Sequence, residues 1–277
     1  MKIKKIAVLG CLLIWSLLVT GQNKNFFFIQ ITDPQFGMYE ENTGFARETE
    51  LYEQTVSHIN RLNPDFVVIT GDFVHDPDDE DQIREFKRIT GKIDSKIPVY
   101  MIPGNHDVGL VPTKESLKKY RTNYGSDRFS FFHKGVHFIG LNTSLIKAEI
   151  PKLEPKQAKW LQKVLTNGRN ADRIVVFGHY PFFIETYDEP EKYSNLKIDY
   201  RIKYFSLFKA YNVSAVFSGH LHNNKEVVYN GIQVVTTTAV GKPLGDAPSG
   251  FRIIKIVNDR IEHNFYGLNA VPDSVKL

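Results

Sequence analysis

The sequence predicts an α/β protein with mixed strand pairing, and three patterns support this prediction. In the first part of the chain, short apolar β-branched runs alternate with helical patterns, as they do where helices connect parallel strands. A Lys-Gly turn within residues 129–141 then indicates an antiparallel hairpin. The last quarter is rich in strand patterns, two of which flank Asn230-Gly231. These patterns predict one domain that combines parallel and antiparallel strands with crossover helices.

Each expected element follows from apolar periodicity and from the turn residues that bound it. Strands are expected at residues 26–32, 66–70, 97–102, 129–133, 136–141, 174–177, 213–217, 226–229, 232–238, 251–257 and 261–266. Helices are expected before Asn63-Pro64, at 82–93, at 114–124, from Pro155 to Asn167, and in a segment that ends near Tyr211. Proline is tolerated at a helix start, and Gly168 ends the fourth of these helices.

Residues 1–21 have the pattern of a signal peptide that precedes a domain spanning residues 22–277. Three lysines precede an uncharged apolar run, residues 6–20, which is short for a membrane span. Small residues end the run, so cleavage is expected before Gln22. The pattern predicts export to the periplasm or the extracellular space, without stable membrane insertion after cleavage. The alternative is a membrane anchor formed by an uncleaved segment.

Removal of this segment would leave a chain with little net charge and no cysteine. The formal net charge is +4, and three of the positive charges are the lysines of residues 1–21. The remaining chain has no basic tract, so nucleic-acid binding is not expected and a nuclease is disfavoured. The single cysteine is Cys11. The domain therefore needs neither a disulfide nor a thiolate metal site.

Five of the expected strands end in a polar cluster, and this coincidence indicates a functional site. Any one cluster could be a capped turn or a surface histidine. In a mainly parallel sheet, however, ligands gather beyond the carboxyl ends of the strands. The clusters are Asp33 with Gln35, Asp72, Asn105-His106-Asp107, His179, and His220 with His222.

These residue types suit a centre of two divalent metal ions. Carboxylate, carboxamide and imidazole groups bind hard or borderline cations, which leaves Mn, Fe, Zn and Mg as candidates. Two ions roughly 3.5–4 Å apart hold the attacking and leaving oxygens during hydrolysis of a phosphate ester. Asp72, the only carboxylate beside the glycine of its cluster, is the expected bridge. A metal-bound hydroxide, formed from water whose pKa falls from ~15.7 towards neutrality, would be the nucleophile.

The set Asp-x-Gln, Gly-Asp, Gly-Asn-His-Asp, Gly-His and Gly-His-x-His resembles the calcineurin-like metallophosphoesterase superfamily. The Asp-Pro-Gln-Phe-Gly motif at residues 33–37 and the loop 241–250 are similar to one branch, the calcineurin-like phosphoesterase-domain-containing proteins of serine/threonine phosphatase type. The resemblance implies a mixed two-sheet β-sandwich flanked by helices, with two divalent metal ions and with the loop 241–250 beside the active site.

The resemblance also implies a role for each site residue. The ions would share Asp72, and the other ligands would be Asp33, Gln35 and His222 for the first ion and Asn105, His179 and His220 for the second. His106 would contact the phosphate and protonate the leaving oxygen, with Asp107 orienting its ring. Gln35 stands where many members have histidine, and its weaker amide oxygen leaves the identity of the first ion open. For His75, a surface position or a supporting role beside the ligands is preferred to direct contact with phosphate.

The expected function is hydrolysis of phosphate monoesters by an exported dinuclear metal enzyme. The substrate would be a phosphoprotein or a small phosphorylated metabolite. A phosphodiesterase or nucleotide hydrolase of the same fold is the alternative. A noncatalytic ligand-binding protein would be favoured by loss of the bridging or acid residue, but Asp72 and His106 are both present. The oligomeric state stays open.

Overall fold

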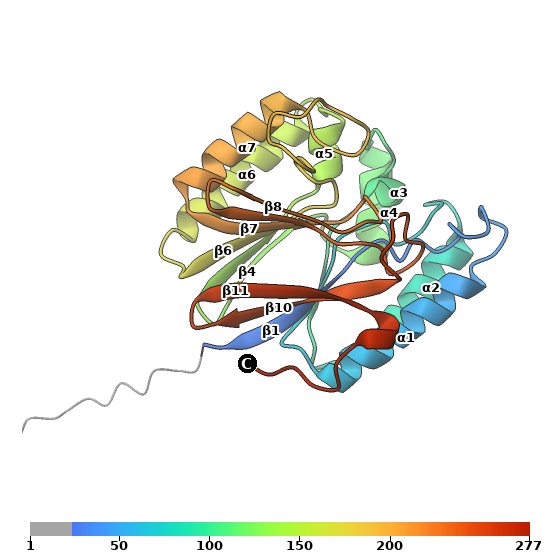
Figure 1. Cartoon of the computed structure of the whole chain (residues 1–277). Helices are drawn as coiled ribbons and strands as arrows, with labels where there is room; N and C mark the ends of the chain where they lie inside the picture. Colours follow the sequence, from blue (N-terminus) through green and yellow to red (C-terminus); the bar gives the residue numbers. More distant parts are fainter. Residues whose placement is uncertain (1–23) are drawn as a thin grey trace, which may run out of the picture.

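Two β-sheets lie face to face in the computed structural model, which describes residues 24–277 (Figure 1). The expected signal peptide lies outside these residues. In chain order the strands are β1 (Phe26–Ile31), β2 (Val67–Ile69), β3 (Val99–Met101), β4 (Phe129–His133), β5 (Val136–Gly140), β6 (Arg173–Phe177), β7 (Val213–Ser218), β8 (Lys225–Tyr229), β9 (Ile232–Thr236), β10 (Gly250–Val257) and β11 (Arg260–Gly267). Each expected strand is present, with ends that differ by no more than two residues.

Both sheets mix parallel and antiparallel pairs. The first has the order β11-β10-β1-β2-β3, in which β1, β2 and β3 are parallel and β10 is antiparallel to its neighbours. The second has the order β4-β5-β6-β7-β9-β8, with a parallel centre and an antiparallel strand at each edge. The predicted hairpins at Lys134-Gly135 and Asn230-Gly231 are confirmed.

The helices include two short ones that sequence periodicity does not reveal. They are α1 (Ala46–Leu62), α2 (Glu80–Thr90), α3 (Asn105–Val108), α4 (Lys114–Tyr124), α5 (Thr143–Lys147), α6 (Leu153–Asn167), α7 (Ile198–Ala210) and the 3₁₀ turn η1 (Leu268–Ala270). The third and fifth are too short to show a helical repeat. The sixth begins at Leu153 rather than at Pro155, because proline is tolerated throughout the first turn, where N–H groups have no helical partner. None of the helices within residues 24–277 is both long and apolar enough to span a membrane.

Three apolar clusters hold the layers together. Aromatic side chains such as Phe28, Phe66 and Phe138 fill the space between the sheets, and the Phe28 and Phe66 rings stack with centroids 4.7 Å apart. Helices α1 and α2 cover the outer face of the first sheet, and α6 and α7 cover that of the second (Figure 1). The arrangement confirms the predicted mixed two-sheet sandwich flanked by helices.

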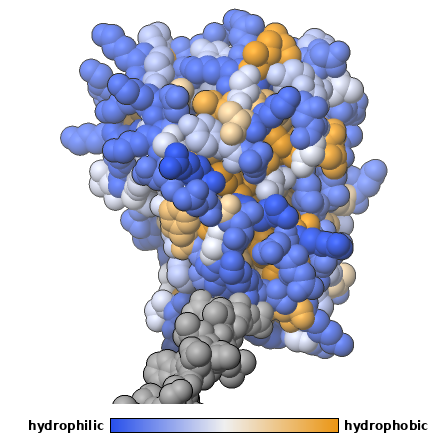
Figure 2. Space-filling model, turned by 90° about the vertical axis from the view of Figure 1, so that its left-hand side faces the viewer, coloured by the Kyte–Doolittle hydropathy of each residue, from blue (hydrophilic) through white to orange (hydrophobic). Residues whose placement is uncertain are grey.

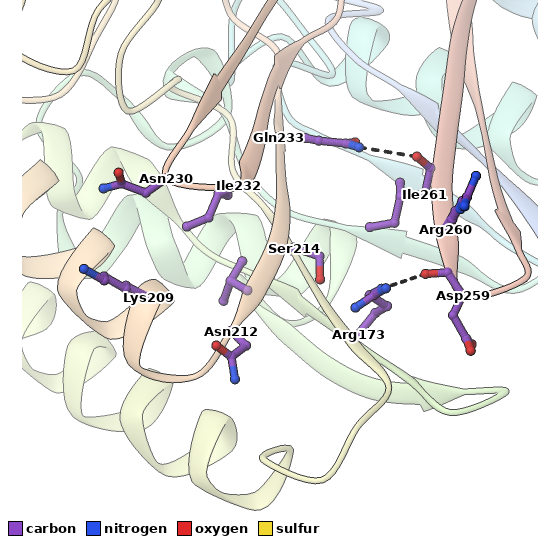
Figure 3. Close-up of a pocket in the computed structure, with 12 residues that line it drawn as sticks. Arg173, Lys209, Asn212, Ser214, Asn230, Ile232, Gln233, Asp259, Arg260 and Ile261 are labelled. Carbon is purple, nitrogen blue, oxygen red and sulfur yellow. Dashed lines mark hydrogen bonds between the residues drawn. The ribbon is translucent and has the colours of Figure 1, made fainter.

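The two ends of the sandwich differ in character. A groove of about 660 Å³ lies at the amino ends of β6, β7 and β9, where Arg173, Lys209 and Arg260 line it (Figure 3). None of the predicted site residues lines this groove, because they follow the opposite ends of the strands.

On the face shown in Figure 2, hydrophilic residues predominate and hydrophobic residues are interspersed among them.

Candidate metal centre

The five polar clusters meet at the carboxyl ends of the strands of both sheets. The loops after β1, β2 and β3 carry clusters from the first sheet, and those after β6 and β7 carry clusters from the second. Two groups of possible ligand atoms form here, and within each group the atoms lie within 4.8 Å of one another. The groups are Asp33, Asp72 and His222, and Asp72, His179 and His220. Asp72 belongs to both, as expected of a bridging carboxylate.

His179 is surrounded by lone pairs, which indicates that a cation belongs beside it. Its Nδ1–H donates to the carbonyl oxygen of Thr70 at 2.8 Å, so Nε2 is directed into the cluster. Around Nε2 lie Asn105 Oδ1 at 3.1 Å, Asp72 Oδ2 at 3.2 Å and His220 Nδ1 at 3.2 Å. Four acceptor atoms this close repel one another unless a proton or metal ion lies between them. The donor set therefore fits a divalent metal ion.

The pKa of His179 also indicates that positive charge is favoured in this half of the centre. Burial opposes a charge on His179, but the carboxylates of Asp72 and Asp33 outweigh it and raise the pKa of His179 to about 9. Burial, reinforced by the charge on His179, lowers the pKa of His220 to about 3. The carboxylates thus favour positive charge beside them, and a metal ion bound here would supply it in place of a proton on histidine.

The other half contains Asp33, His222 and Gln35. His222 donates from Nδ1 to the Lys242 carbonyl at 2.5 Å, and its Nε2 lies 3.4 Å from Asp33 Oδ1. The backbone N–H of Gln35 donates to the Asp72 carbonyl at 2.9 Å, which places Gln35 beside the shared carboxylate. Gln35 Oε1 is buried and has no hydrogen-bond partner among residues 24–277. A buried oxygen without a donor fits the fourth expected ligand of the first ion.

Unusual backbone conformations orient the side chains of the expected metal ligands. Five of the seven expected ligands have positive φ, a conformation that only a small share of non-glycine residues adopt. They are Asp33 (51°), Gln35 (39°), Asp72 (50°), His220 (71°) and His222 (49°). All seven side chains are buried.

Glycine allows the loops to approach closely. A Cβ on Gly104 would lie 2.1 Å from Asp72 Oδ1 and 2.5 Å from Asp72 N, so any larger residue would displace the shared carboxylate. A Cβ on Gly71 would lie 2.7 Å from His179 Nδ1. The glycines beside the polar residues therefore provide the space in which two loops and two sheets meet.

The structure corrects the role expected of Asp107. Its carboxylate accepts hydrogen bonds from the backbone N–H groups of Asp72 at 2.8 Å, Phe73 at 2.8 Å and Gly104 at 2.7 Å. The ring of His106 is instead held by the carbonyl oxygen of His75, which accepts from Nδ1–H at 2.8 Å. Asp107 thus ties together the two loops that carry the motifs, whereas the partner of the His106 ring is the His75 carbonyl and not Asp107.

Supporting contacts come from residues that do not belong to the five polar clusters. The Thr143 hydroxyl oxygen accepts from the backbone N–H groups of His179 and Tyr180 at 2.9 and 2.8 Å. The Tyr193 hydroxyl accepts from Asn105 Nδ2 at 3.4 Å, and the Tyr193 ring lies against that of His220 with centroids 5.0 Å apart. The loop 241–250 contacts the centre, as the resemblance implied, through the carbonyl of Lys242. The contacts of Thr143 are with residues more than thirty positions away, so no local motif marks it.

Comparisons with known proteins agree with this geometry. A model of the calcineurin-like phosphoesterase family matches residues 26–224. The chain is 36% identical over 267 residues to the serine/threonine-protein phosphatase CPPED1 of Bos taurus, covering 90% of this chain and 85% of the relative.

Two solved structures share the fold. A dimetal phosphatase from Danio rerio superposes with a TM-score of 0.66 at 16% identity, covering 88% of this chain and 96% of that protein. The purple acid phosphatase PPD1 from yellow lupin superposes with a TM-score of 0.69 at 14% identity, covering 91% and 53% of the two chains.

Proposed function

The chain belongs to the calcineurin-like phosphoesterase family, and from this premise we propose that it is an exported phosphatase that hydrolyses phosphate monoesters with two divalent metal ions. The observation that carries the proposal is the pair of ligand groups that share Asp72. Family membership and the named phosphatase relative make the chain a metal-dependent phosphoesterase. The monoester preference, the export and the individual residue roles are the parts that we propose.

The side chains divide the work of phosphate hydrolysis between binding and proton transfer. Two bound ions would supply an acidified water and would neutralise the charge of the phosphate. Asp72 would hold the ions close together, and its Oδ1 also accepts from the backbone N–H of His106 at 2.8 Å. His106 is only partly buried, and its Nδ1–H is engaged by the His75 carbonyl. Its Nε2 is thus the atom that would deliver a proton to the leaving oxygen.

Two observations support the finer parts of the proposal. The relative from Bos taurus is named a serine/threonine-protein phosphatase, and phosphoserine and phosphothreonine are monoesters. The basic start and apolar run of residues 1–21 support export.

Substrate class is tested by a metal-reconstituted activity panel. The purified protein, loaded with Mn, Fe, Zn or Mg, is assayed on p-nitrophenyl phosphate, bis-p-nitrophenyl phosphate, a nucleotide, a sugar phosphate and a phosphopeptide. We expect the monoesters to be hydrolysed faster than the diester. A preference for the diester would contradict the proposal and favour the phosphodiesterase alternative.

Residue roles are tested by two variants and a control. Asp72→Asn is expected to lose most of the activity together with metal binding. His106→Ala is expected to lower kcat by about 10²–10⁴-fold while it retains both ions, since it removes only proton transfer. His58→Ala, on a helix outside the site where His58 contacts the Leu268 carbonyl, should retain activity. Full activity of Asp72→Asn would exclude the shared-carboxylate assignment.

Export is tested separately from catalysis. The full chain is expressed in a bacterial host, and the N-terminus of the protein from each cell fraction is determined by mass spectrometry. We expect an exported form that begins at Gln22. An unprocessed chain confined to the membrane fraction would favour the uncleaved anchor.

A further inference from the structure

His75 lies between an expected ligand of the first ion and the expected proton donor. Its Nδ1 is 3.1 Å from Gln35 Nε2, and its ring stacks on that of His106 with centroids 4.8 Å apart and planes 20° apart. We propose that His75 is a positioning residue that selects the orientation of the Gln35 carboxamide, so that the amide oxygen faces the first metal ion. The inference rests on the proposed metal centre and deepens it.

A glutamine ligand needs a partner of this kind. The two ends of a carboxamide have nearly the same shape, but one donates hydrogen bonds and the other accepts them. Within the described residues, Gln35 Oε1 is buried without a partner, whereas Nε2 has His75 Nδ1 as its acceptor. In the reversed orientation, the NH₂ group would face a cation, and the oxygen would meet His75 favourably only in the tautomer that carries a proton on Nδ1. With the lone pair on Nδ1, the contact with Nε2 favours the orientation that leaves the oxygen free for the ion.

The backbone holds His75 in place for this role. Its N–H donates to the Phe36 carbonyl at 2.9 Å and to Gln82 Oε1 at 3.0 Å. Phe36 also pairs with Val74 in an isolated parallel bridge, which joins the loop of Gln35 to the loop of His75. The distance between the two side chains is therefore set by main-chain contacts on both sides.

Two of the three imidazole ligands of the centre are oriented in an equivalent way. His179 and His222 each donate from Nδ1 to a backbone carbonyl, which leaves Nε2 for the cluster. In Gln35 the NH₂ group takes the place of the second ring nitrogen, and its partner is His75 Nδ1 rather than a backbone carbonyl. The contact with His75 supplies the same restriction for an amide, since it occupies the donor end and leaves the oxygen free.

The experiment measures metal affinity rather than activity. Mn²⁺ is titrated calorimetrically into the metal-free protein and its variants. The parent is expected to bind two ions. His75→Phe keeps a ring that can stack on His106 but has no acceptor, and it should weaken one of the two sites by about 10–100-fold while the other is unchanged. His75→Asn places an oxygen near the position of Nδ1 and should restore most of the lost affinity.

A second background separates orientation from packing. Gln35→Glu has an oxygen at both ends of the side chain, so its orientation no longer matters. In that background His75→Phe should weaken Mn²⁺ binding less than it does in the parent, because a hydrogen bond to the carboxylate is lost but the choice of orientation is not. An equal loss in both backgrounds, or parent-like affinity of His75→Phe itself, would overturn the inference. A parent that binds two Mn²⁺ ions but hydrolyses no phosphate ester would refute the proposed function alone, while the affinities would still decide the role of His75.

Discussion

Stability should depend on pH through His137, a residue of β5 that is remote from the metal centre. Its side chain is fully buried, with Nε2 2.7 Å from the Ser130 hydroxyl and the ring stacked on Phe132 at 4.2 Å. Nδ1 has no hydrogen-bond partner within residues 24–277, and a Cβ on Gly168 would lie 1.9 Å from it. Burial without an acceptor disfavours the charged ring and lowers the pKa of His137 to about 4.

The direction of the effect follows from where the proton binds. An unfolded histidine takes up its proton near pH 6.5, whereas the folded His137 does so only near pH 4. Between these values the unfolded chain binds more protons, so stability is complete above pH 6.5 and is lost as the pH falls. From about pH 7.5 to about pH 5, this residue alone should lower the free energy of unfolding by about 2 kcal/mol.

The assay compares urea unfolding of the parent and of His137→Gln across this pH range. Glutamine cannot ionise, and its amide can still reach the Ser130 hydroxyl. Other titrating groups, including the metal ligands, are common to both proteins and cancel in the difference between the two curves. The stability advantage of the parent should shrink by about 2 kcal/mol on acidification. Parallel curves would refute the assignment of a lowered pKa to His137.

Three further outcomes are expected. Gly104→Ala should lose metal binding and activity, because its Cβ would collide with Asp72. The control is Gly91→Ala, at a helix end where the nearest atom to the Cβ would be 3.2 Å away. Metal content measured by atomic spectroscopy should fall in the first variant only. Asp107→Asn should lower the free energy of unfolding in urea by about 1–3 kcal/mol, since an NH₂ group would face a main-chain donor; unchanged stability would show that the three contacts are dispensable. Chelation should lower the melting temperature, because ions at 100 times their Kd stabilise the folded state by about 2.7 kcal/mol; Asp72→Asn should abolish most of that shift.

Local sequence was enough to predict the strands and most of the helices, and it pointed to the side chains that form the two groups of possible ligands. Apolar alternation and turn residues act over a few positions, so the strand ends and the helix Lys114–Tyr124 could be predicted. The polar clusters were recognisable because each follows a strand directly. The expected loop role of residues 241–250 also agrees with the structure, through the contact between Lys242 and His222.

Only the tertiary structure decided how these pieces meet. Strand order, with β10 beside β1, depends on pairing between segments more than two hundred residues apart in the chain. The partner of the His106 ring proved to be the carbonyl of His75 rather than Asp107, because loops from neighbouring strands come into contact there. The orientation of Gln35 likewise depends on a side chain forty residues away. Short motifs therefore indicate the chemistry of the centre, whereas the contacts that orient each ligand arise from packing between segments distant in the sequence.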